Sequence, residues 1–161
     1  MEIIRITKVT DDLAEMVALF RVELRSYKGI VSKPNVDVGR VEMEEYLATG
    51  FPVFAAMVDG QYAGYVVCRV DSEVVWVESI FVKEEYRRHG VATALHNKAE
   101  EIAASYGDDT VYNYVHPNNH RMIGFLRKRG YTVLNLIEIR KPYKDEKLNQ
   151  TITVGEHEFD Y

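Results

Sequence analysis

Residues 73–92 read EVVWVESIFVKEEYRRHGVA, and this stretch decides the fold. Its first half, residues 73–82, is rich in valine, isoleucine, phenylalanine and tryptophan, which is typical of a buried central strand. From Gly90 onward the apolar residues follow a helical period instead. The stretch therefore predicts a central strand, a basic turn and the start of a helix.

The chain downstream of Gly90 alternates helix and strand. A single apolar stripe predicts a helix as far as Tyr106, which Gly107 closes as the residue after the cap. A strand at residues 110–115 should run parallel to the central strand, because a whole helix separates the two. The remaining expectations are a helix from Asn118 or Asn119 to Arg129, a strand at residues 131–140, a loop at 142–150, and a strand or hairpin at 151–159 about Gly155-Glu156.

The chain upstream of the central strand predicts a strand, two helices and a meander. Asp12, with Glu15 three residues later, has the pattern of a helix start. Asp59-Gly60 is a hairpin signal. The expected elements are a strand at 3–7, helices at 12–25 and 37–48, and strands at 52–58 and 61–70 that lead into 73–82.

This order, β-α-α-β-β-β-α-β-α-β-β, indicates an α+β fold. Its sheet should be mixed but mostly antiparallel, with six or seven strands and helices on both faces. The length of 161 residues and the absence of a linker predict one domain spanning residues 1–161.

The composition narrows the classes of partner. A net charge of −5 gives no reason to expect nucleic acid. No run of apolar residues is long enough for a membrane span, and the amino terminus lacks the pattern of a signal peptide. The single cysteine, Cys68, allows no intramolecular disulfide, and zinc-ligand spacings are absent, so we expect a cytoplasmic protein without a metal. Two short basic clusters, at residues 87–89 and 127–129, suit a compact anionic ligand.

The turn at residues 87–92 has the features of a phosphate site. A helix start exposes backbone N–H groups without partners, and its dipole adds partial positive charge. Gly90 lets a ligand approach the backbone, Arg87 and Arg88 bring charge, and Thr93 brings a hydroxyl. The turn lacks the sequence of a P-loop and has a single glycine, so it is not a dinucleotide fingerprint either.

Two segments in the right order resemble the GNAT N-acetyltransferases. Residues 82–92 look like the family's pyrophosphate motif, Arg/Gln-x-x-Gly-x-Gly/Ala, placed after a central strand. Asn119, Ile123, Phe125 and Gly130-Tyr131 resemble a second segment of the family. The resemblance covers residues 1–140 and extends poorly to the tail.

The resemblance implies binding of acetyl-CoA and transfer of its acetyl group to an amine. The strands near 79–82 and 110–115 would separate and admit the pantetheine arm. Backbone groups would pair with that arm and polarise the thioester, and Asn119 would contact it. The implied cofactor-binding residues are Ile80, Phe81, Val82, Arg87, Arg88, His89, Gly90, Val91, Ala92, Thr93 and Asn119.

Glu78 is the candidate general base. Strict alternation directs it to the same face as Trp76 and Ile80. Its apolar neighbours should reduce the hydration of the carboxylate, which would strengthen it as a proton acceptor. The alternatives are that Glu78 faces solvent or pairs with an arginine. Glu73 is a weaker candidate.

The general acid is where the sequence departs from the family, because Leu126 stands where a tyrosine is common. Tyr114 and His116 are candidate catalytic residues near the next strand, and Tyr112 or Tyr114 could line the acceptor pocket. A solvated His116 is the alternative. By analogy with the family, the acceptor should bind near residues 20–40, with Tyr27 and Lys28 lining its site.

Three functions remain open at this point. The first is an active N-acetyltransferase that acts on a protein amino group or a small amine. The second is an acyl-CoA-binding module without catalysis, which Leu126 motivates; an unrelated phosphate-ligand binder is a third. A strand in the tail could pair with a second subunit to form a homodimer or close its own sheet.

Overall fold

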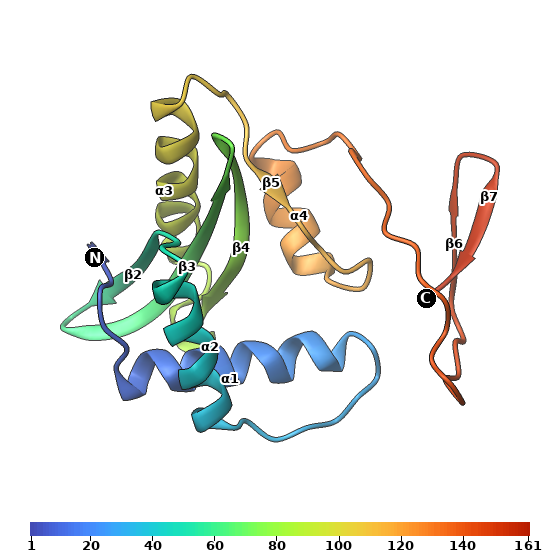
Figure 1. Cartoon of the computed structure of the whole chain (residues 1–161), viewed down its shortest axis with the longest axis horizontal. Coiled ribbons are helices and arrows are strands. Elements are labelled where there is room, and N and C mark those ends of the chain that lie inside the picture. The colour runs from blue at the N-terminus through green and yellow to red at the C-terminus, as the bar shows by residue number, and fades with distance from the viewer. The chain divides into compact units, whose positions relative to one another are not determined.

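The computed structural model describes residues 1–161, and its helices and strands follow the predicted order as far as the helix at residues 120–128 (Figure 1). The chain forms two compact units, Met1–Phe125 and Leu126–Tyr161, which are described separately. The elements are β1 (Glu2–Arg5), α1 (Asp11–Ser26), α2 (Val36–Ala48), β2 (Val53–Val58), β3 (Gln61–Asp71), β4 (Val74–Val82), the short 3-10 helix η1 (Glu84–Tyr86), α3 (Val91–Ser105), β5 (Tyr112–Asn113), α4 (His120–Lys128), β6 (Thr151–Val154) and β7 (His157–Asp160).

The first unit is built on a five-stranded sheet in the order β1-β2-β3-β4-β5. The first four strands pair antiparallel, and β5 pairs parallel to β4. The mixed, mostly antiparallel α+β fold is therefore confirmed. The seven strands do not form a single sheet, because five of them form one sheet and β6 and β7 form a separate two-stranded sheet.

Helices cover both faces of the five-stranded sheet (Figure 1). Tyr65 and Val67 of β3 pack in one core with α1 and α2. Their neighbours in β3 point to the opposite face, because successive side chains of a strand alternate. There, Gly64 lies so close to Leu95 of α3 that an added Cβ would come within 3.2 Å of the leucine side chain. The site is thus built on a sheet that is held from both sides.

The start of α1 differs from the expectation. Thr10, rather than Asp12, is the cap: its side chain accepts a hydrogen bond from the Leu13 N–H at 3.3 Å. Thr10 has the extended backbone that a cap requires, whereas Asp11 and Asp12 already lie in the first helical turn. Their charges suit that position, because carboxylates are favourable near the positive end of the helix dipole.

The second unit contains the predicted hairpin but not the strand at residues 131–140. β6 and β7 pair antiparallel around a turn at Gly155-Glu156, where Gly155 has a φ of 63°. Residues 131–140 form no strand. The prediction was wrong because alternation reports only a preference for extended backbone, and a strand also needs a partner to satisfy its N–H and C=O groups.

Candidate functional site

The turn before α3 presents backbone donors without partners. Arg88 and Gly90 both have left-handed backbone, with φ of 67° and 81°. The N–H of Ala94 donates to the carbonyl of Gly90 at 3.0 Å, which is the first hydrogen bond of the helix. No side chain caps this end. The N–H groups of Val91, Ala92 and Thr93 are therefore available to an anion.

The basic residues of the turn have different surroundings. Arg88 and His89 are exposed. Arg87 instead turns back along the sheet: its Nε donates to the carbonyl oxygen of Val82 at 2.9 Å, and its Nη2 lies 3.0 Å from Oε2 of Glu23. Arg87 is therefore committed to the protein, and the positive charge that remains free at the turn comes from Arg88.

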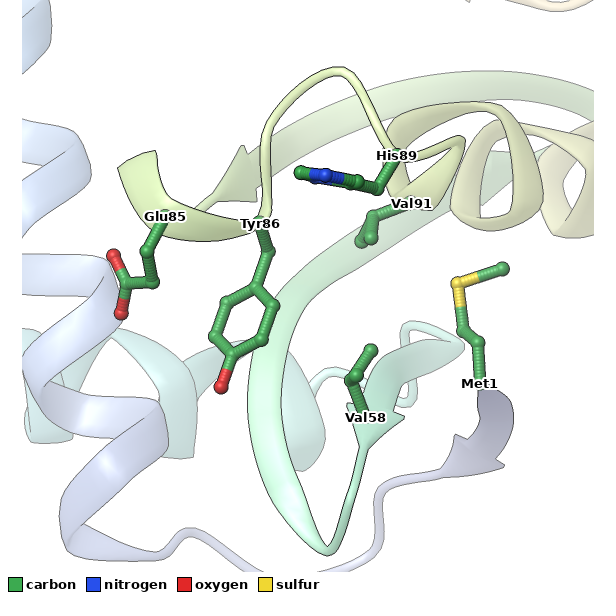
Figure 2. A pocket seen from close by; sticks show the side chains of 6 residues that line it. All are labelled: Met1, Val58, Glu85, Tyr86, His89 and Val91. Carbon is green, nitrogen blue, oxygen red and sulfur yellow. The ribbon is translucent and has the colours of Figure 1, made fainter.

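A pocket of about 330 Å³ adjoins this turn (Figure 2). Glu85 and Tyr86 line it from η1, His89 lines it from the turn, and Val91 lines it from the start of α3. Val58 at the end of β2 and Met1 complete the wall. The side of the turn next to His89 is thus hollow rather than packed.

The strands β4 and β5 separate soon after they meet. Only two pairs join them, Trp76 with Tyr112 and Val77 with Asn113. The rest of β4 has no strand on that edge, as the family resemblance implied.

The register of β4 shows which backbone groups face the open edge. The N–H of Lys83 donates to the carbonyl of Ala63 in β3 at 2.9 Å. Because backbone groups alternate direction along a strand, Phe81 also faces β3, whereas Ile80 and Val82 face the opening. The backbone groups of Phe81 therefore do not face the opening, in contrast to the expectation that they would pair with the pantetheine arm. Its ring packs near Phe20 and Tyr65. The carbonyl of Val82 is already taken by Arg87, which leaves the N–H of Val82 and both groups of Ile80.

A bulge in β4 orients Glu78. Val77 pairs with Cys68 and Ser79 pairs with Val67, so Glu78 has no partner in β3. Strict alternation, which placed Glu78 and Ile80 together, is broken at this point. Glu78 instead shares a face with Arg69: Nε of Arg69 lies 3.3 Å from Oε2 of Glu78.

Arg69 is itself held by two aromatic rings. Its guanidinium carbon lies 4.4 Å from the ring centre of Trp76 and 5.7 Å from that of Tyr114. Its Nη2 donates to the Tyr114 hydroxyl at 3.5 Å. Opposite residues in an antiparallel pair share a face, and Arg69 pairs with Trp76. Glu78 thus has an arginine neighbour, and its side chain remains 30% exposed.

His116 is half-buried just beyond β5 and lies against α1. Its ring stacks on Tyr27, with centroids 6.2 Å apart and planes 15° apart. The N–H of Asn118 donates to its Nδ1 at 3.1 Å, so the neutral ring carries its proton on Nε2. Burial, and then the charge of Lys28, lower the pKa of His116 below its usual value of 6.5. His116 is therefore neutral at pH 7 and donates, rather than accepts, at Nε2.

The other predicted residues are placed as follows. Asn119 caps α4, because its Oδ1 accepts from the N–H of Met122 at 3.0 Å. Tyr114 is mostly exposed, and Thr93 is exposed near the start of α3. Leu126 is buried and offers no proton donor.

Sequence reasoning missed Glu23 and Arg69. Glu23 contacts Arg87 although 64 positions separate them, and Arg69 reaches Glu78 from the neighbouring strand. Neither belongs to a motif, and each looks like an ordinary polar residue of an amphipathic helix or strand. No local signal in the sequence marks such pairs.

Comparisons with known proteins show the family and the fold of the chain. Residues 16–131 match the model of the Acetyltransferase (GNAT) family. An N-acetyltransferase of Methanocaldococcus jannaschii is 33% identical over 85 residues, which cover 48% of this chain and 38% of that protein. The chain thus matches well under two thirds of the length of that relative.

Solved structures share the fold. The aminoglycoside acetyltransferase AAC(6')-Iy, bound to a bisubstrate analogue of CoA and acetylneamine, superposes with a TM-score of 0.65 at 23% identity, covering 88% of this chain and 98% of that one. The aminoglycoside 6'-N-acetyltransferase AAC(6')-IG from Acinetobacter haemolyticus gives a TM-score of 0.63 at 21% identity, covering 90% and 100%.

The chain therefore belongs to the GNAT acetyltransferase family. The family match and the shared fold confirm the resemblance that residues 82–92 and 119–131 indicate. As for membranes, none of the helices combines the length and the apolar character that a span requires.

Proposed function

We propose that this chain is an acetyl-CoA-dependent N-acetyltransferase that passes an acetyl group directly to a primary amine. The observation that carries the proposal is the uncapped start of α3 beside the open edge of β4. The first supplies donors for a pyrophosphate, and the second supplies donors for an extended thioester arm. The two lie on consecutive elements of one chain, as a ligand with both parts requires.

The cofactor would be held mostly by backbone atoms. The N–H groups of Val91, Ala92 and Thr93 take the pyrophosphate above Gly90, with Arg88 and His89 at its side. Ile80 and Val82 pair with the pantetheine arm, and Asn119 contacts it from the start of α4. An N–H group on this edge polarises the thioester carbonyl, and removal of such a donor typically lowers the rate about 10²–10³-fold.

The chemistry then needs one base. The amine nitrogen adds to the carbonyl carbon, the C–S bond breaks, and sulfur leaves as the CoA thiolate. The amine loses one proton, which Glu78 accepts directly or through water. In the tautomer described above, His116 could donate a hydrogen bond from Nε2, and the Tyr114 hydroxyl is a second candidate donor. A thiolate is a fair leaving group, so the buried Leu126 does not prevent the reaction.

The acceptor belongs to the same proposal. The solved relatives include enzymes that act on aminoglycosides. A small amine or a protein amino group would approach Glu78 from the side of α1 and the Tyr27 loop. The acidic net charge of −5 favours a cationic acceptor over nucleic acid.

We further propose that residues 1–161 act as one catalytic domain in the cytoplasm, where the buried thiol of Cys68 would remain reduced. A homodimer formed through the tail is part of this proposal, because edge strands such as β6 and β7 pair readily with another chain. Sizing by light scattering tests it.

The test of function is thiol release from acetyl-CoA with three amines: neamine, spermidine and a lysine-containing peptide. Turnover with at least one amine supports the proposal. Failure of acetyl-CoA to bind by calorimetry would refute it. Tight binding of acetyl-CoA with no turnover, and with the same affinity in Glu78→Gln, would instead favour the module without catalysis. The pairing of Glu78 with Arg69 makes this a specific alternative.

A further inference from the structure

We propose that Glu23 is a positioning residue that sets the acetyl-CoA turn through Arg87, so that Arg87 supports the turn instead of contacting the pyrophosphate. The inference rests on the proposed function and concerns a residue of α1 that belongs to no motif. Several charged and polar groups contact its carboxylate.

Two arginines from separate elements meet at Glu23. Arg87 of the turn reaches Oε2 at 3.0 Å, and Arg121 of α4 pairs with Oε1. The Tyr27 hydroxyl donates to Oε1 at 2.9 Å and accepts from Nη2 of Arg121 at 3.3 Å. The carboxylate is only 21% exposed, so solvent screens these pairs less than pairs on an open surface.

Arg87 connects Glu23 to the open edge of β4. Its Nε donates to the carbonyl of Val82, and its guanidinium lies 5.8 Å from the ring centre of Phe81. Three contacts thus fix a side chain that starts within the turn, immediately before the left-handed Arg88. A fixed Arg87 restrains the backbone from Val82 to Gly90, and this backbone presents the donors at the start of α3.

The same carboxylate also reaches the start of the loop where the acceptor is expected. Tyr27 ends α1, its carbonyl accepts from Nδ2 of Asn118 at 2.9 Å, and its ring stacks on His116. Glu23 therefore joins the turn for acetyl-CoA to the loop that follows α1. A single negative charge faces two positive ones, so its loss would leave both guanidinium groups without a counter-ion.

The experiment compares acetyl-CoA affinity by calorimetry in the full chain and in Glu23→Gln, which keeps the shape and removes the charge. We expect the Kd to rise about tenfold, with partial rescue in Glu23→Asp. Arg87→Gln should raise it similarly, and the double variant should be no worse than either single one, as coupled residues behave.

Glu42→Gln is the matched control. Glu42 is a half-buried carboxylate of α2. It pairs with Arg21, which belongs to α1 as Glu23 does, but it has no contact with the turn. It should leave the Kd within twofold, even if the melting temperature falls as far as in Glu23→Gln. If Glu23→Gln does not fold, Arg87→Gln alone removes the same ion pair from the side of the turn.

The possible outcomes distinguish a failure of the positioning role of Glu23 from a failure of the proposed function. A Kd that is unchanged in Glu23→Gln, or equally raised in Glu42→Gln, would overturn the positioning role and leave the proposed function intact. A lower Kd would also overturn it, because it would mean that Glu23 withholds Arg87 from the pyrophosphate. No binding by the unsubstituted chain would refute the proposed function and this inference with it.

Discussion

Oε2 of Glu78 lies 3.3 Å from Nε of Arg69, whose guanidinium is stacked on Trp76. The pair joins neighbouring strands at the one point where their register shifts. An arginine in this position holds the carboxylate in place. The orientation of the proposed base therefore depends on a residue that no motif contains.

Glu78→Gln tests the role of the carboxylate. The amide keeps the shape but cannot take the proton of the amine, so kcat should fall about 10²-fold while the acetyl-CoA Kd stays within twofold. Steady-state kinetics with the best amine and calorimetry measure the two quantities. Glu73→Gln, at the exposed turn between β3 and β4, is the control and should retain full activity. Equal losses in both variants would argue against Glu78 as the base.

Gly90→Asp tests the anion site. Nothing lies within 4 Å of an added Cβ, and aspartate tolerates left-handed backbone better than most residues, so the variant should fold. Its carboxylate would occupy the donors of α3 and repel the pyrophosphate. We expect the acetyl-CoA Kd to rise at least about tenfold, which equals about 1.4 kcal/mol.

Gly107→Asp is the matched control, because it places the same residue at the other end of α3, where φ is 83° and the space is equally open. A carboxylate there opposes the helix dipole and should lower stability by about 0.3–1 kcal/mol. Its Kd should not change. If the two variants weaken binding alike, the site does not lie at the start of α3.

Tyr65→Phe tests the buried polar pair beneath the site. The hydroxyls of Tyr65 and Ser79 lie 2.8 Å apart, and both residues are almost completely buried. Removal of one hydroxyl leaves the other without a partner, which should lower the free energy of unfolding by about 1–3 kcal/mol. Urea titration measures this. Tyr65→Phe combined with Ser79→Ala should recover part of the loss, and additive losses would contradict the pairing.

His116 should make stability depend on pH. Its pKa is lowered in the folded chain by burial and by Lys28, so the unfolded chain takes up a proton more readily. The stabilisation is complete above the unfolded pKa of about 6.5 and is lost as the pH falls through the lower folded pKa. His116→Gln should therefore reduce the drop in melting temperature between about pH 7.5 and pH 5. His120→Gln, which removes an exposed imidazole of α4, is the control.

The elements that sequence reasoning placed correctly are those with strong local patterns. The amphipathic stripe of α3, the Asp59-Gly60 hairpin and the Gly107 helix end all follow from contacts within a few residues. The parallel direction of β5 followed from the length of the crossover. The fold also followed from the family resemblance at residues 82–92 and 119–131, and the family model matches residues 16–131.

The expectations that differ from the structure mainly concern contacts between residues that are far apart in the sequence. Residues 131–140 alternate like a strand, yet a partner decides whether a strand forms, and local pattern does not identify one. Arg87 was expected to serve the ligand, and its engagement with Glu23 is visible only in three dimensions. Glu78 shares a face with Trp76 as expected but not with Ile80, because a bulge leaves no mark in a two-residue period.

That bulge has a consequence for how the site can change over time. The halves of β4 on either side of Glu78 are out of phase, so Trp76 and Ser79 occupy the same face although their spacing is odd. Deletion of residue 78 would join Val77 directly to Ser79, so the strand would alternate regularly with Trp76 and Ser79 still on one face, and only the bulged carboxylate would be lost. Substitution can vary the chemistry at position 78, whereas a deletion there would remove that position and leave the rest of the strand facing as before.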